Sequence, residues 1–135
     1  MDSLRNIVKK YLNANYVNIY TINTMLTKKS EVKEDYVINM HKDQDCASSL
    51  TIFIYWTDVS KTNGATKVLS GDHLFEHDRK VRGYVSEESV EYLEGQGGSV
   101  FAVDTWAMHA GNLNITSPRL VTWIRFSSMP ARTYY

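Results

Sequence analysis

The N-terminal residues show a helical pattern of apolar positions. The apolar side chains recur at i, i+3, i+4, i+7 and i+8, on one face of a helix: Leu4, Ile7, Val8, Tyr11 and Leu12. The pattern predicts an amphipathic helix over residues 1–14, which Asn13-Ala14-Asn15 would end. From Tyr16 the period falls to about two. Residues 16–26 are rich in Tyr, Val, Ile and Thr, and therefore predict a β-strand.

Beyond residue 27 the chain alternates between short strand patterns and clusters of turn residues. The predicted strands span residues 36–40, 50–56, 65–69, 99–103, 105–109 and 119–127. Residues 50–56 are apolar on both faces, which predicts a strand covered on both sides. Asn63-Gly64 predicts a hairpin turn shortly after it, and residues 86–93 are compatible with a short second helix. About eight short strands with one external helix favour a mainly β fold, a sandwich or jelly roll.

Length and charge restrict the class of protein. The 135 residues fit one domain, 1–135, with the strand-rich core over residues 16–127. Lys and Arg total 15 and Asp and Glu total 15, so no basic excess is present to neutralise nucleic-acid phosphates. No apolar run approaches the ~20 residues of a membrane span, and residues 1–5 lack a signal-peptide core. The single Cys46 excludes an internal disulfide framework. These features indicate a cytoplasmic domain without nucleic-acid or membrane partners.

One short segment, His41-Lys42-Asp43, has the spacing of a metal site. Residues i and i+2 of a strand point to the same face, about 7 Å apart at the backbone, so the imidazole and the carboxylate project together. A second histidine from a neighbouring strand would complete a set of two histidines and one carboxylate, which suits Fe(II) in oxygen-activating enzymes. Three histidines could supply it: His73, His77 and His109. Asp45 shares the parity of Asp43 if the strand continues.

The surroundings of these histidines differ, and one arginine follows the last of them. His109 ends an apolar strand, and rigid strands hold ligands best. His73 and His77 lie in a polar segment at i and i+4, so a helical zinc pair is the alternative. Arg119 opens an apolar strand ten residues after His109. A guanidinium there needs an anionic partner, either a bound carboxylate or an acidic side chain of the protein.

Several short segments follow one another in an order that is more specific than any one of them. These are His41-Lys42-Asp43, Trp56-Thr57-Asp58-Val59 with Asn63-Gly64, Val68-Leu69-Ser70-Gly71-Asp72-His73, Gly98-Ser99-Val100-Phe101-Ala102-Val103-Asp104, His109-Ala110-Gly111-Asn112 and Pro118-Arg119. In this order they resemble the phytanoyl-CoA dioxygenase family of Fe(II)/2-oxoglutarate oxygenases. The resemblance covers about residues 36–127 of the chain.

The resemblance implies a fold, a reaction and a set of site residues. The fold is a double-stranded β-helix, the cupin-like jelly roll. The reaction consumes O2 and decarboxylates 2-oxoglutarate to succinate, coupled to hydroxylation of a second substrate. The resemblance implies three Fe(II) ligands that form the catalytic centre: His41, Asp43 and His109. It also implies contacts to 2-oxoglutarate from Arg119, which would bind the distal carboxylate, and from Trp56 and Met40. Core packing is the alternative role for Trp56 and Met40.

The sequence departs from the family pattern in two respects. The usual P-G-S-H is Ser70-Gly71-Asp72-His73 here, and family members carry more helices and loops ahead of the H-x-D than the 40 residues found in this sequence. Those parts normally shape the substrate pocket. A phytanoyl-CoA substrate therefore does not follow, and the expected substrate is an unspecified small molecule. Two alternatives to the oxygenase remain: a cupin-like metal-binding module with reduced turnover, and a subunit whose pocket a partner or a second copy completes.

Overall fold

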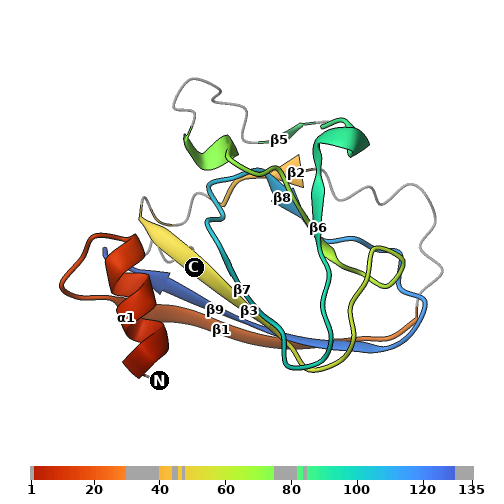
Figure 1. The fold of residues 1–135 in the computed structure, drawn as a ribbon, viewed down its shortest axis with the longest axis horizontal. Coiled ribbons are helices and arrows are strands. Elements are labelled where there is room, and N and C mark those ends of the chain that lie inside the picture. Colours follow the sequence, from red (N-terminus) through yellow and green to blue (C-terminus); the bar gives the residue numbers. More distant parts are fainter. Residues whose placement is uncertain are drawn as a thin grey trace, which may run out of the picture.

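The computed structural model describes residues 2–29, 40–43, 46, 48–74, 82–83 and 85–129. Nine strands form two antiparallel sheets in this part of the chain, with one α-helix, α1 (Asp2–Tyr11), outside them (Figure 1). This arrangement confirms the predicted mainly β, cupin-like jelly roll with one N-terminal amphipathic helix. No helix among the described residues is long and apolar enough to cross a bilayer.

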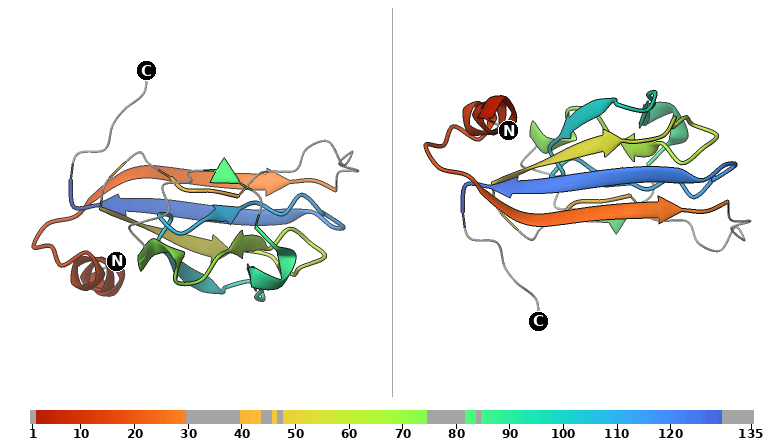
Figure 2. Two further views of the ribbon diagram at one scale, coloured as in Figure 1. Left: turned by 90° about the horizontal axis from the view of Figure 1, so that it is seen from above. Right: turned by 90° about the horizontal axis from the view of Figure 1, so that it is seen from below.

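The two sheets differ in the length of their strands. The long-stranded sheet has the order β1-β9-β3-β7, formed by Asn18–Thr27, Arg119–Ser127, Ser49–Tyr55 and Val100–Val103. The short-stranded sheet has the order β5-β2-β8-β4-β6, formed by Arg82–Gly83, Met40–His41, His109–Ala110, Thr66–Val68 and Glu91–Leu93. β1, β9 and β3 run side by side along the molecule (Figure 2). β1 to β4 alternate between the two sheets, and so do β6 to β9, whereas β4, β5 and β6 all belong to the short-stranded sheet.

Helix α1 packs on the outer face of the long-stranded sheet. Its Val8 is fully buried and packs with Leu50 and Phe126 from β3 and β9. The helix ends where Asn13 adopts a positive φ of 47°, a conformation that asparagine tolerates better than most residues. Only part of the predicted apolar stripe faces the sheet: Leu4 and Leu12 pack beside Val8, whereas Ile7 and Tyr11 are exposed. The observed helix is also shorter than the predicted 1–14.

Strand β3 is central in its sheet and largely buried on both faces. It pairs with β9 on one side and with β7 on the other. Leu50 and Ile52 pack toward α1, whereas Phe53 packs toward the short-stranded sheet with Val68 and Leu93. This confirms the prediction of a strand covered on both faces, because the core lies between the two sheets and under the helix.

The predicted hairpin at Asn63-Gly64 is wrong. β3 pairs with β7 and β9, whereas β4 pairs with β6 and β8, so the loop that contains Asn63 crosses from one sheet to the other. The Asn63 side chain instead accepts hydrogen bonds from the backbone N–H groups of Thr116 and Ser117, at 3.1 and 3.0 Å. Asn63 and Gly64 do lie in a loop, but Asn63 ties that loop to residues 116–117 instead of closing a hairpin.

Two further segments differ from their predicted secondary structure. Residues 86–93 contain only a 3₁₀ turn, η2 (Glu87–Ser89), followed by β6, because pairing of β6 with β4 overrides the weak helical pattern. Residues 104–107 form a turn in which Asp104 accepts the Trp106 N–H, so only His109–Ala110 of the predicted 105–109 is strand. Most of the predicted strand 36–40 lies outside the described residues.

Candidate metal centre

His41 and His109 are directly opposite each other on neighbouring strands. They are Cα partners where β2 pairs with β8, and their ring centroids are 4.5 Å apart. Asp43 follows β2, and its backbone N–H donates to the Thr105 carbonyl at 2.9 Å. This hydrogen bond fixes the backbone just beyond the strand. Pairing of short strands in one sheet thus brings together residues that are far apart in the sequence.

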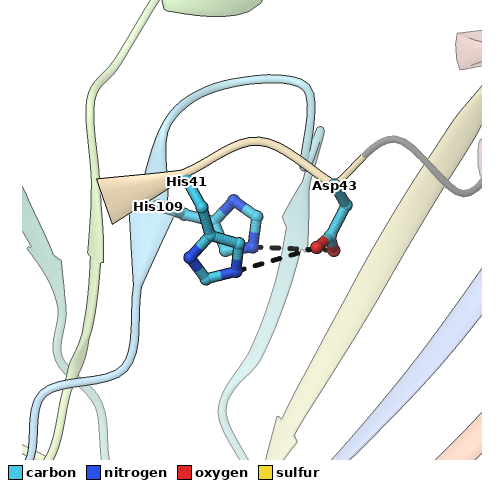
Figure 3. Close-up of side chains that lie close together, drawn as sticks. All are labelled: His41, Asp43 and His109. Atoms are coloured by element: carbon cyan, nitrogen blue, oxygen red, sulfur yellow. Dashed lines mark ion pairs between the residues drawn. The ribbon is translucent and has the colours of Figure 1, made fainter. Parts of the chain in front are cut away.

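The three side chains converge on one point (Figure 3). Asp43 Oδ1 lies 3.7 Å from His41 Nε2, and Asp43 Oδ2 lies 3.6 Å from His109 Nε2. One donor atom from each residue can be chosen so that all three lie within 4.8 Å of one another. Two donors on one first-row metal ion lie on the order of 3–3.5 Å apart. The three residues therefore fit a metal ion after small movements of the side chains.

Hydrogen bonding prepares His109 for this role. Its Nδ1 lies 3.0 Å from the Ala107 carbonyl, which can only accept a hydrogen bond, so Nδ1 carries the proton when the ring is neutral. In the neutral ring Nε2 presents a lone pair toward Asp43 and His41, the form that binds a metal, whereas in the protonated ring Nε2–H can donate to Asp43. The His109 side chain is 8% exposed and that of His41 is 32% exposed. The site is therefore sheltered on the His109 side and open on the His41 side.

Arg125 is a further residue of the site. Its Nη2 lies 2.7 Å from Asp43 Oδ2. Burial raises the pKa of Asp43. A hydrogen bond from His109 and the positive charges of His109, Arg125 and His41 lower it by more, so the net pKa lies below the usual value. Asp43 is therefore ionised at neutral pH, which is the form that binds a metal. No local pattern in the sequence predicts this contact, although Arg125 has the same strand parity as Arg119.

A cavity of about 270 Å³ opens beside the metal centre. His41 and His109 line it from the short-stranded sheet. Its opposite wall is the inner face of β9, where alternate residues point into it: Arg119, Val121, Trp123 and Arg125. Phe53 adds an aromatic ring whose centroid is 6.5 Å from that of Trp123. The cavity therefore combines apolar walls with two guanidinium groups.

Arg119 lies in this cavity, as the resemblance implied. Its Nη1 donates to the Gly64 carbonyl, and its Nε is buried without a hydrogen-bond partner among the described residues. Burial lowers the pKa of Arg119, and the nearby Tyr55 hydroxyl raises it in part. A guanidinium remains protonated under such conditions. A buried cation with unused donors is suited to an anionic ligand.

Gly64 is packed directly under Arg119, which gives a testable prediction. Its φ is +81°, and an added Cβ would lie 2.9 Å from Arg119 Nε and overlap Ile115 Cδ1. We expect Gly64→Ala to lower the free energy of unfolding by roughly 1–3 kcal/mol. Gly71→Ala is the matched control, because Gly71 has a φ of +78° with nothing within 4 Å of the added Cβ. Urea unfolding of both variants measures the difference, and equal losses would show that only backbone strain matters.

Met40 and Trp56 do not line the cavity. Met40 is buried and packs against Met108 and Ala110. Trp56 is 55% exposed, and its Nε1 donates to Thr122 Oγ1 at 2.8 Å. The structure thus brings Arg119 together with the histidines and Asp43 but places Met40 and Trp56 elsewhere. Their predicted contacts with 2-oxoglutarate receive no support from this geometry.

The alternative ligands occupy less favourable positions or lie outside the described residues. His73 is exposed and lies within the short 3₁₀ turn η1 (Asp72–Leu74) that follows β4. His77 and Asp45 lie outside the described residues. In the part of the chain that the structure describes, His41, Asp43 and His109 are the one group of three His, Cys, Asp or Glu side chains close enough to share an ion.

Fold and site together define a class: a double-stranded β-helix in which two histidines and one carboxylate meet beside a cavity. Solved structures of similar fold include proteins that are named as α-ketoglutarate-dependent or that have 2-oxoglutarate bound. A non-haem α-ketoglutarate-dependent carbocyclase, SnoK from nogalamycin biosynthesis, aligns with a TM-score of 0.71 and 15% identity over 95% of this chain and 56% of its own. HygX from Streptomyces hygroscopicus, with nickel and 2-oxoglutarate bound, aligns with a TM-score of 0.69 and 14% identity over 94% and 62%.

EctD from S. alaskensis, with 2-oxoglutarate and 5-hydroxyectoine, is a third such structure. Its TM-score is 0.68, with 18% identity over 92% of this chain and 48% of EctD. By sequence, the chain is 36% identical over 62 residues to the dioxygenase swnH2 of Arthroderma benhamiae, which is 46% of this chain and 18% of that protein. No protein-family profile matches. The chain spans about half to two-thirds of these structures and a fifth of that dioxygenase, and the structural likeness establishes the fold.

Proposed function

We propose that this chain is an Fe(II)- and 2-oxoglutarate-dependent oxygenase with His41, Asp43 and His109 as its metal ligands. The supporting observation is that two imidazoles and one carboxylate meet beside a cavity of a double-stranded β-helix. Such a set leaves further positions of an iron ion open for other ligands. Iron bound there would supply the activation of O2, in concert with 2-oxoglutarate.

Arg119 is the proposed partner of the distal carboxylate of 2-oxoglutarate. It lines the same cavity as both histidines, and its guanidinium has a buried donor without a hydrogen-bond partner in the described part of the chain. Two parallel hydrogen bonds from the guanidinium would hold the carboxylate. The keto-acid end of the co-substrate would then be oriented toward the three metal-ligand side chains, which is an effect of position.

The walls of the cavity suggest a small-molecule substrate. Phe53, Val121 and Trp123 would exclude water from the bound co-substrate. Asp43 occupies the ligand position that a halide would otherwise take, so oxidation of a C–H bond, in the first place hydroxylation, is proposed rather than halogenation. Membership of the phytanoyl-CoA dioxygenase family belongs to the same proposal, and the ordered motifs of the sequence support it.

The decisive experiment is to detect succinate. We expect the purified chain, with Fe(II), ascorbate, O2 and 2-oxoglutarate, to release succinate above the level of His109→Ala under the same conditions. Even without the prime substrate, slow uncoupled decarboxylation is the expected signal. Candidate substrates are then screened by the increase in succinate and by the mass of the product. A gain of about 16 mass units, one oxygen atom, marks hydroxylation.

The other outcomes separate the alternatives. Tight binding of Fe(II) without succinate release would favour a cupin-like binding module. Succinate release only in an assembled form, detected by measuring the mass in solution, would favour a pocket completed by a second copy or another partner. Absence of both metal binding and succinate release, in a folded preparation, would refute the proposal.

A further inference from the structure

Lys42, between two of the proposed metal ligands, is buried. β2 ends at His41, and the Lys42 side chain pairs with an acidic residue outside the triad. The side chain is 8% exposed, and its Nζ lies 2.8 Å from Asp72 Oδ2. A buried ammonium is costly unless it is paired with an anion. Asp72 therefore holds the segment that carries His41 and Asp43.

The same oxygen of Asp72 also holds the segment that carries His109. The backbone N–H of Met108, the residue before His109, donates to Asp72 Oδ2 at 2.9 Å. The Asp72 side chain is 13% exposed, so both contacts are shielded from water. One carboxylate oxygen thus connects the neighbour of His41 and Asp43 with the neighbour of His109.

The backbone conformation of residues 68–71 places Asp72 next to Lys42 and Met108. Val68, in β4, is the Cα partner of His109 in β8, and the Leu69 N–H donates to the Met108 carbonyl at 2.8 Å. The chain then reverses at Gly71, whose φ is +78°, and Asp72 returns over the start of β8 toward Lys42. Asp72 therefore connects three adjacent strands, β4, β8 and β2, on the side of the sheet that Lys42 faces.

We propose that Asp72 is a positioning residue for the metal centre. By binding Lys42 and the Met108 N–H together, it sets the separation of β2 and β8 and hence the distances among His41, Asp43 and His109. The inference rests on the proposed function, because it assumes that these three residues bind a metal ion. Asp72 itself is outside the group of three ligands, because its carboxylate contacts Lys42 and the Met108 N–H instead.

The test measures Co(II) binding, using both the dissociation constant and the visible spectrum of the bound ion. We expect Asp72→Ala to bind Co(II) about tenfold to a hundredfold more weakly than the unmodified chain, a range typical of residues that orient metal ligands. Its spectrum should also change, because the ligand geometry changes. Measurements are made well below the melting temperature, so that every variant is folded. Val8→Ala is the control, because Val8 packs α1 against the long-stranded sheet and is not part of the triad. This variant should have a lower melting temperature, with both Co(II) readouts unchanged.

Two conservative variants keep the inference testable if Asp72→Ala fails to fold. Asp72→Asn retains an acceptor for the Met108 N–H but loses the charge that balances Lys42, so an intermediate affinity is expected. Lys42→Met leaves the Asp72 carboxylate without its ammonium partner and should also weaken Co(II) binding. Unchanged affinity and spectrum in the folded Asp72 variants, with a lowered melting temperature, would reduce Asp72 to a purely structural residue while the proposed function stands. Failure of the unmodified chain to bind Co(II) would instead overturn the proposed function and this inference with it.

Discussion

We expect His41→Ala and His109→Ala each to lose Fe(II) binding, with an affinity reduced by more than about 100-fold. Loss of a residue that only orients a ligand already costs 10–100-fold, so loss of a ligand should cost more. Only two protein donors would remain in either variant, and Asp43 would lose the imidazole that now faces it at 3.6–3.7 Å. Anaerobic titration with Fe(II), or with Co(II) as a spectroscopic probe, measures the effect directly.

The control for this prediction is His73→Ala. His73 is exposed, and it is a histidine that the sequence alone left open as a ligand. Its replacement should leave the metal affinity within about twofold. Circular dichroism should show that all three variants keep their β-sheet content, because the strands that carry the ligands belong to a preformed fold. If His73→Ala lost the metal and His109→Ala kept it, the choice of the distal histidine would be wrong.

The sequence predicted the metal centre better than the rest of the site. The spacing of His41 and Asp43 predicted that the two side chains project together, and they lie 3.7 Å apart, although the strand ends at His41 and does not include Asp43. The order of the motifs pointed to His109, and the pairing of β2 with β8 brings it opposite His41. Arg119 followed from the same match and lies in the same cavity. Each of these inferences depended on local geometry or on motif order, which a sequence contains.

Tertiary contacts explain what the sequence did not predict. The contact of Arg125 with Asp43 requires the register between the two sheets, which no local pattern encodes. The burial of Lys42 depends on Asp72, thirty residues away in the sequence, and looks from the sequence alone like an exposed lysine. Trp56 was expected beside the co-substrate because of its motif. It does not line the cavity, and its exposed side chain donates a hydrogen bond to Thr122.

The final prediction concerns the co-substrate and rests on Arg119. We expect Arg119→Met to weaken 2-oxoglutarate binding far more than metal binding. Methionine keeps much of the apolar volume but removes the charge and all of the donors. Loss of one partner of a largely desolvated charged pair costs roughly 2–5 kcal/mol, which corresponds to at least about a thirtyfold rise in Kd. The measurement is a titration of 2-oxoglutarate into the anaerobic Co(II)-loaded chain.

Two further variants identify the cation that acts. Lys28→Met removes an exposed charge just beyond β1 and should leave both affinities unchanged. Arg125→Met should weaken metal binding as well, because Arg125 contacts Asp43 at 2.7 Å. Among these three variants, only Arg119→Met is therefore expected to lose 2-oxoglutarate binding while it retains Co(II) binding. If Arg119→Met retained the co-substrate and Arg125→Met lost it, the carboxylate would bind at the opposite end of β9, and the co-substrate would have to enter the cavity in the reverse direction.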